Sequence, residues 1–115
     1  MSVPLATATL DRELALSRVG GDAELLKEIG GLFLDEYPRV LAELRGAVER
    51  GDAGGVERAA HGLKGSVANF GARPAVDAAC ALEVMGRTHQ LEEVEQVLHT
   101  LDLALAALRP ELESL

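Results

Sequence analysis

The chain has 115 residues, of which 48% are hydrophobic and only 3% aromatic, and it carries a formal net charge of −8. This length is enough for one domain, residues 1–115, with a core that needs neither a disulfide nor a metal. The acidic charge argues against nucleic acid and anionic membranes as partners, because both are bound through basic residues.

The single cysteine and the N-terminal segment argue against a disulfide-bonded, secreted or membrane-spanning protein. Cys80 has no second cysteine to pair with, and its apolar surroundings are typical of a small buried residue. The N-terminus lacks the basic and apolar regions of a signal peptide, and no apolar run reaches the roughly 18 residues of a membrane span. We therefore expect a soluble cytoplasmic domain in which residues 1–10 form a flexible N-terminal segment.

The first part of the chain predicts a short helix and then a long one. Residues 11–19 have the pattern of a short amphipathic helix. Asp22 is typical of a helix N-cap, and apolar residues recur after it at intervals of three and four as far as Gly51. This spacing predicts a helix over residues 22–50, which Pro38 could kink or split in two.

Two further helices follow in the middle of the chain. Asp52 can cap a helix over residues 53–70, and Gly71 is well placed to end it. Pro74 suits the first turn of a helix over residues 73–87. The residues expected to point inward from that helix are Val76, Ala79, Cys80 and Leu82.

The last helix is expected over residues 90–108. Leucines and valines repeat there with alternating spacings of three and four, and Pro110 should end or kink the helix near Leu108. The same stripe would fit a coiled-coil dimer, but a chain with other apolar helices favours packing within a bundle. No segment has the alternation of a strand. The fold class is therefore all-α, an antiparallel four-helix bundle with an additional short N-terminal helix, and we expect a monomer.

The segment HGLKGS, residues 61–66, places a histidine among glycines within a predicted helix. Each glycine costs about 1 kcal/mol relative to alanine in a helix, so the pair needs a reason. At about 100° per residue, His61 lies opposite the apolar stripe and points outward. Lys64 is one turn away, and Gly62 and Gly65 leave bare backbone that another molecule could approach closely. The outward face around His61 comprises Glu57, Arg58, Lys64, Gly65 and Ala68.

Other chemistries fit this sequence poorly. The three histidines have no zinc-site spacing, and no phosphate-binding glycine motif is present. Glu57, four residues before His61, could orient the imidazole, although such exposed pairs are more often simply solvated. His99 lacks a neighbouring cation, and His89 lies in a turn that would position a nucleophile poorly. His61 is therefore the candidate reactive histidine.

The segment AAHGLKGSVANFGA, residues 59–72, resembles the signature of histidine-containing phosphotransfer (HPt) domains. Weaker similarity extends over nearly the whole chain, in the segments at 20–22, 32–44, 51–52 and 82–83. The chain departs from the family pattern at Gly62, where Thr, Ser or Arg is more usual.

The resemblance implies that His61 accepts a phosphoryl group from a receiver-domain phospho-aspartate, or from a histidine kinase or hybrid kinase, and passes it to a response-regulator receiver. Lys64 would lie beside the phosphoryl oxygens, and Gly65 would let the receiver close over His61. Glu57, Arg58, Gly62 and Ala68 would complete the partner-binding face. The chain would bind no cofactor or metal, and the receiver would supply Mg²⁺, so the protein would be a carrier without kinase activity of its own.

Three alternatives remain at this point. The chain could be the phosphorylatable domain of a larger hybrid or chemotaxis-type kinase. It could instead be a helical binding module whose His61 is never phosphorylated. A small metal-binding or ligand-binding bundle would need inward polar groups, which the apolar stripes almost entirely lack.

Overall fold

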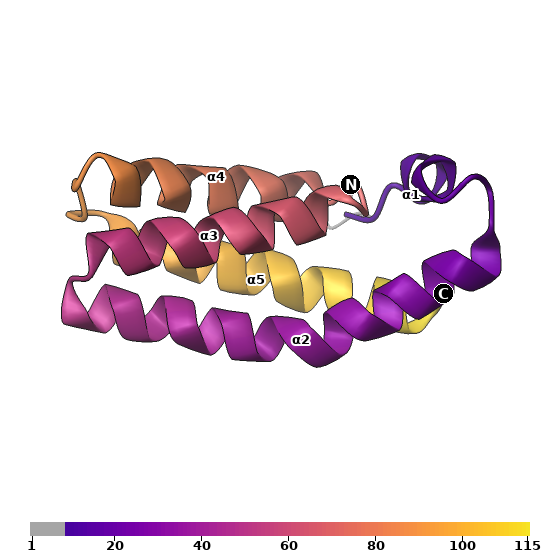
Figure 1. The fold of residues 1–115 in the computed structure, drawn as a ribbon, viewed down its shortest axis with the longest axis horizontal. Helices are drawn as coiled ribbons and strands as arrows, with labels where there is room; N and C mark the ends of the chain where they lie inside the picture. The colour runs from indigo at the N-terminus through magenta and orange to yellow at the C-terminus, as the bar shows by residue number, and fades with distance from the viewer. Residues whose placement is uncertain (1–8) are drawn as a thin grey trace, which may run out of the picture.

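The structure is a computed structural model that describes residues 9–115, and this part of the chain contains helices and turns but no strand. The five helices are α1 (Arg12–Arg18), α2 (Ala23–Arg50), α3 (Ala53–Ala68), α4 (Arg73–Arg87) and α5 (Val94–Glu113). Figure 1 shows α2 to α5 running side by side along the molecule, while α1 lies across one end. None of the helices in the described range is long and apolar enough to cross a membrane.

The four long helices form a closed ring in chain order. Within residues 9–115, α2 packs on α3, α3 on α4, α4 on α5 and α5 back on α2, whereas no Cα atoms of the two diagonal pairs come within 8 Å of each other. Short turns join successive helices, so neighbours are antiparallel. This arrangement confirms the expected all-α antiparallel bundle with a short additional N-terminal helix.

The helix starts follow the predicted caps. Three aspartate side chains each accept a hydrogen bond from the backbone N–H three residues later: Asp11 from Leu14, Asp22 from Leu25 and Asp52 from Gly55. Gly51 and Gly71 both take a positive φ just beyond α2 and α3, as helix-terminating glycines do.

Pro38 does not divide α2. The helix is continuous from Ala23 to Arg50, although Figure 1 shows that it bends along its length. Tyr37 and Leu41, on either side of the proline, are both buried in the core. Their packing holds the helix together across the hydrogen bond that proline cannot donate.

The bounds expected for the last helix were wrong at both ends. Instead of starting near residue 90, α5 starts at Val94, after a turn in which His89 has a positive φ of 57°. It also continues through Pro110 to Glu113 instead of ending at Leu108. Leu112 is only 4% exposed. Its burial in the core stabilises the last turn of α5 by more than Pro110 destabilises the helix.

The inward face of α4 differs from the prediction at Cys80, which is exposed. Ala75, Ala79, Leu82 and Gly86 follow one another at intervals of four, three and four residues and form the buried stripe. Cys80 lies about 100° around the helix from Ala79, which takes it off this stripe. The apolar neighbours of Cys80 in the sequence therefore do not indicate which side of α4 the cysteine faces.

The start of the described chain is fastened to the far end of α5. The backbone amides of Thr9 and Leu10 donate to the two carboxylate oxygens of Glu111, at 3.0 and 2.8 Å. The amide of Asp11 donates to the carbonyl of Phe70, in the turn that follows α3. The segment expected to be flexible, residues 1–10, is thus anchored at its last two residues, and residues 1–8 lie outside the described part.

Candidate functional site

His61 stands on the outer face of α3, near the middle of the bundle. Its side chain is 68% exposed, whereas Ala60 and Leu63 on either side of it are buried in the core. A Cβ added at Gly62 or at Gly65 would meet nothing within 4 Å. Neither glycine is therefore required for packing among residues 9–115, and together they leave open backbone beside the imidazole.

The imidazole is held by a carboxylate that comes from the neighbouring helix. Nδ1 of His61 lies 2.8 Å from Oε2 of Glu83, on α4. The other oxygen of the same carboxylate, Oε1, is 2.6 Å from Nζ of Lys64. The Glu83 side chain is only 11% exposed, so this contact is largely shielded from solvent. One carboxylate thus joins the two residues that the sequence singled out on α3.

Glu83 and Lys64 each stabilise the ionised form of the other. Hydrogen bonds from Lys64 and from His61 hold the pKa of the Glu83 carboxyl below its ordinary value. The hydrogen bond to Glu83 in turn raises the pKa of the Lys64 ammonium. A second cation, Arg87, lies 3.9 Å from Oε2 of Glu83. Glu83 is therefore ionised and Lys64 charged at neutral pH.

An ionised carboxylate can only accept hydrogen bonds, so the proton between Glu83 and His61 belongs to Nδ1. The neutral imidazole then carries its lone pair on Nε2, the nitrogen that faces away from Glu83. This assignment follows from the hydrogen-bond network. The arrangement presents a fixed, exposed nitrogen nucleophile.

Glu83 is the site residue that sequence reasoning missed. The sequence offers Glu57 as a residue that could orient His61, but no hydrogen bond joins the two in the described chain. The signal for Glu83 was a charged residue on the buried stripe of α4, one position after Leu82. Glu83 is also the one buried charged residue between residues 9 and 115.

The remaining residues of the expected partner face surround His61 at different depths. Arg58, Gly62 and Gly65 are exposed, while Glu57 and Ala68 are half-buried. The hydroxyl of Ser66 donates to the carbonyl of Gly62 at 3.1 Å, which occupies it within its own helix. All the predicted residues therefore lie on α3, and the structure adds Glu83 and Arg87 from α4.

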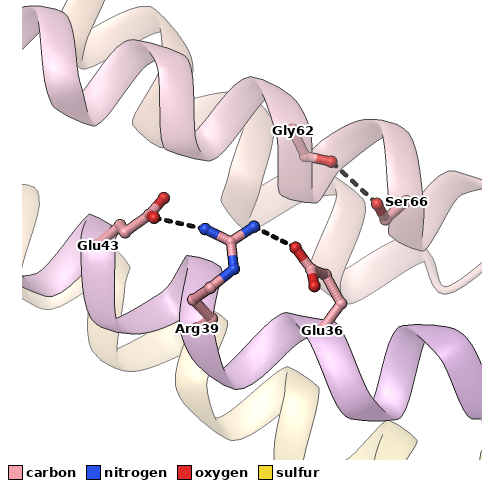
Figure 2. A network of polar contacts seen from close by, with 5 residues as sticks. All are labelled: Glu36, Arg39, Glu43, Gly62 and Ser66. Atoms are coloured by element: carbon pink, nitrogen blue, oxygen red, sulfur yellow. Dashed lines mark hydrogen bonds and ion pairs between the residues drawn. The ribbon is translucent and has the colours of Figure 1, made fainter.

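The α2 side of this face carries a second cluster of charged residues. Figure 2 shows Arg39 extending between Glu36 and Glu43, next to the part of α3 that carries Gly62 and Ser66. Further along, Ile29, Leu32 and Phe33 of α2 face Ser66 and Phe70 across an apolar groove. The face around His61 thus continues from α4 across α3 onto α2.

The other two histidines lie elsewhere. His89 is in the turn after α4, and His99 lines a groove between α2 and α5 with Arg45 and Asp102. Neither ring makes a hydrogen bond to another residue of the described chain. In residues 9–115, no three His, Cys, Asp or Glu side chains are grouped closely enough to hold a metal ion.

Comparisons with known proteins agree with this architecture. The chain is similar to the crystal structure of histidine-containing phosphotransfer protein B (HptB) from Pseudomonas aeruginosa PAO1, with a TM-score of 0.86 and 21% sequence identity over 94% of each chain. At this identity the likeness concerns the fold. No match is found among curated proteins. The family model of the Hpt domain matches residues 28–111, which include α3, α4 and most of α2 and α5. The chain therefore belongs to the Hpt family of histidine phosphotransfer domains.

Proposed function

We propose that this protein is a phosphorelay carrier in which Nε2 of His61 accepts a phosphoryl group and then gives it to a receiver domain. The donor is the phospho-aspartate of a receiver, or a histidine kinase or hybrid kinase, and the acceptor is an aspartate of a response regulator. The observation that carries the proposal is the hydrogen bond between Nδ1 of His61 and Glu83, on a ring that is 68% exposed. In the neutral ring that bond keeps the proton on Nδ1 and leaves the lone pair on Nε2.

The chemistry balances without a proton transfer. The lone pair of Nε2 attacks the phosphorus of the acyl phosphate, a P–N bond forms, and the P–O bond to aspartate breaks with its electron pair going to the carboxylate. Because Nδ1 keeps its proton, the phosphorylated ring is a cation, and the ionised carboxylate of Glu83 stabilises that charge. Onward transfer to the next aspartate reverses these steps.

Lys64 and Gly65 contribute in different ways. Nζ of Lys64, paired with Glu83 at 2.6 Å, places a positive charge one helical turn from His61, where the phosphoryl oxygens arrive. Gly65 leaves room for the loops of the partner to reach the ring. Arg58, Glu57, Gly62 and Ala68 form the contact surface around them.

The partner supplies the rest of the catalysis. Phosphoryl transfer depends chiefly on in-line positioning and on neutralising charge, and Mg²⁺ on the receiver does much of the latter. We infer that this chain binds no cofactor, has no kinase activity of its own, and acts as a monomer in the cytoplasm. A phosphorylatable domain of a larger kinase would use His61 in the same way.

The experiment that tests the proposal incubates the protein with a phosphorylated receiver and Mg²⁺. We expect an acid-labile, base-stable phosphate on the protein that is lost in His61→Gln and retained in His89→Gln and His99→Gln. Label that survives in His61→Gln would contradict the assignment of His61. No label from any receiver or kinase of the source organism would favour a helical binding module instead.

A further inference from the structure

Gly86 brings the backbone of α4 into direct contact with the backbone of α3. A Cβ added at Gly86 would lie 2.6 Å from the carbonyl oxygen of Ala53 and 2.6 Å from the amide nitrogen of Glu57. Both are main-chain atoms, so they cannot swing aside as a flexible side chain would. Gly86 does not have a positive φ, so its backbone conformation does not require glycine. The close approach of α3 is the reason that remains.

This contact lies next to the phosphotransfer site on both helices. Gly86 comes three residues after Glu83 on α4, and Glu57 comes four residues before His61 on α3. Each pair is separated by about one helical turn, and the two helices are antiparallel. The backbone contact and the hydrogen bond that Nδ1 of His61 donates to Glu83 are therefore successive points of one helix–helix interface.

We propose that Gly86 is a positioning residue for phosphotransfer, because its backbone contact with α3 sets the helix separation at which Glu83 reaches both His61 and Lys64. This inference rests on the proposed role of His61. Ordinary van der Waals contact begins near 3.4 Å, so a methyl group at position 86 would force α3 and α4 apart by several tenths of an ångström. The bond from Nδ1 to Oε2 is 2.8 Å long, and a separation near 3.6 Å no longer counts as a hydrogen bond.

The three glycines near the site thus serve opposite purposes. Gly62 and Gly65 face open space and leave room for another molecule, whereas Gly86 is buried and leaves room for α3. Glu83 must bridge to two α3 side chains at once, at 2.8 and 2.6 Å, which leaves its carboxylate little freedom to follow a moving helix. Helix separation therefore determines the protonation pattern of the ring.

The first test reads the tautomer of His61 directly. Nitrogen-15 NMR of the neutral imidazole, recorded on the alkaline side of the ring's own titration as followed in the same spectra, should show the Nδ1–H form predominating in the wild type. Gly86→Ala should shift the ring toward the Nε2–H form, to the same extent as Glu83→Gln. The matched control is Gly31→Ala, on α2, where an added Cβ meets nothing within 4 Å, and it should leave the tautomer unchanged. An unchanged tautomer in folded Gly86→Ala would overturn the inference.

The second test is a double-mutant cycle in the rate of phosphotransfer. If Gly86 acts through Glu83, Gly86→Ala should slow transfer about as much as Glu83→Gln does, and should add less than about a twofold effect in the Glu83→Gln background. Effects that multiply would assign Gly86 a separate, purely structural role and overturn the proposal. The tautomer measurement needs no phosphoryl donor, so it stands even if His61 proves not to be the acceptor.

If Gly86→Ala does not fold, Glu83→Asp tests the same geometry from the other side. This substitution shortens the side chain by one methylene and leaves the helix contact intact. We expect this variant to lose the Nδ1–H preference of His61, because a shorter side chain cannot reach Nδ1 at the wild-type distance between α3 and α4. A retained preference would mean that the spacing set at Gly86 is not limiting, and the inference would fail.

Discussion

The carboxylate of Glu83 on α4 lies 2.8 Å from Nδ1 of His61 on α3, although the two residues are 22 positions apart in the sequence. This contact differentiates the two nitrogens of one exposed imidazole. It also links the ring to the charge of Lys64, so that the histidine proposed as phospho-acceptor, its orienting carboxylate and a cation form one unit.

Glu83→Gln should slow phosphotransfer while preserving the fold. Glutamine has nearly the same shape but no charge, so it neither favours the Nδ1–H form as strongly nor stabilises the cationic phosphorylated ring. A hydrogen bond to a charged group is worth about 1.5–3 kcal/mol, which corresponds to a rate loss of about ten- to a hundredfold. Stopped-flow or quench measurements with a phosphorylated receiver would give this rate. Asp77→Asn, on the exposed side of α4, is the control and should transfer normally.

The stability of the protein should depend on pH through Glu83. The pKa of this carboxyl is lowered in the folded state, chiefly by Lys64 and then by His61, so the ionised form stabilises the fold above the unfolded-state pKa. That contribution is lost as the pH falls through the folded-state pKa. Urea unfolding should therefore show the wild type losing its advantage over Glu83→Gln progressively below about pH 4.5. Parallel stability curves down to about pH 3 would contradict the ion pair.

Gly65→Gln should block phosphotransfer without harming the fold. A side chain at this position meets open space, and glutamine is a better helix former than glycine by up to about 1 kcal/mol. Thermal unfolding should therefore show equal or greater stability, while transfer falls because the side chain stands where the receiver must approach. Gly31→Gln should give the same stabilisation with normal transfer. Full activity in Gly65→Gln would show that this glycine does not serve access.

Leu112→Ala should destabilise the protein by about 2–4 kcal/mol, since Leu112 is buried in the turn of α5 that follows Pro110. Leu103→Ala, at a residue that is 59% exposed on the same helix, should cost less than about 0.5 kcal/mol. Denaturant titrations of the two variants would measure both values. Equal, small losses would mean that α5 ends before Leu112, as the sequence alone suggested.

The protein should sediment as a monomer at micromolar concentration. The leucines that could have formed a coiled-coil seam are instead buried inside the bundle: Leu101, Leu105, Leu108 and Leu112. A helix whose apolar stripe is already covered has little left with which to dimerise. A stable dimer in sedimentation equilibrium would contradict this expectation.

The sequence predicted those features that depend on local patterns. Helix starts at Asp22 and Asp52, the positive φ at Gly71 and the outward position of His61 all follow from caps, glycines and periodicity within a few residues. Such signals do not depend on which helices become neighbours, so they could be read before the structure.

The features that were missed depend on tertiary contacts. The role of Glu83 arises only when α4 packs against α3; in the sequence the residue interrupts an apolar stripe and belongs to a weak family match at 82–83, and neither signal indicates that it contacts His61. The end of α5 was wrong because the local effect of Pro110 is outweighed by the burial of Leu112. Cys80 was expected to face the core but is exposed on α4. Apolar neighbours in the sequence do not determine which side of a helix a small residue faces.

The hydrogen bonds from the amides of Thr9 and Leu10 to Glu111 close nearly the whole described chain into a noncovalent loop. Helix ends ordinarily fray independently, and terminal segments exchange their amide hydrogens first. Here the last turn of α5 cannot unwind without releasing the segment that leads into α1, and α1 cannot leave without freeing Glu111. The two ends of the described range are thus joined into one cooperative unit, and hydrogen exchange in α1 and in the last turn of α5 should proceed at a common rate.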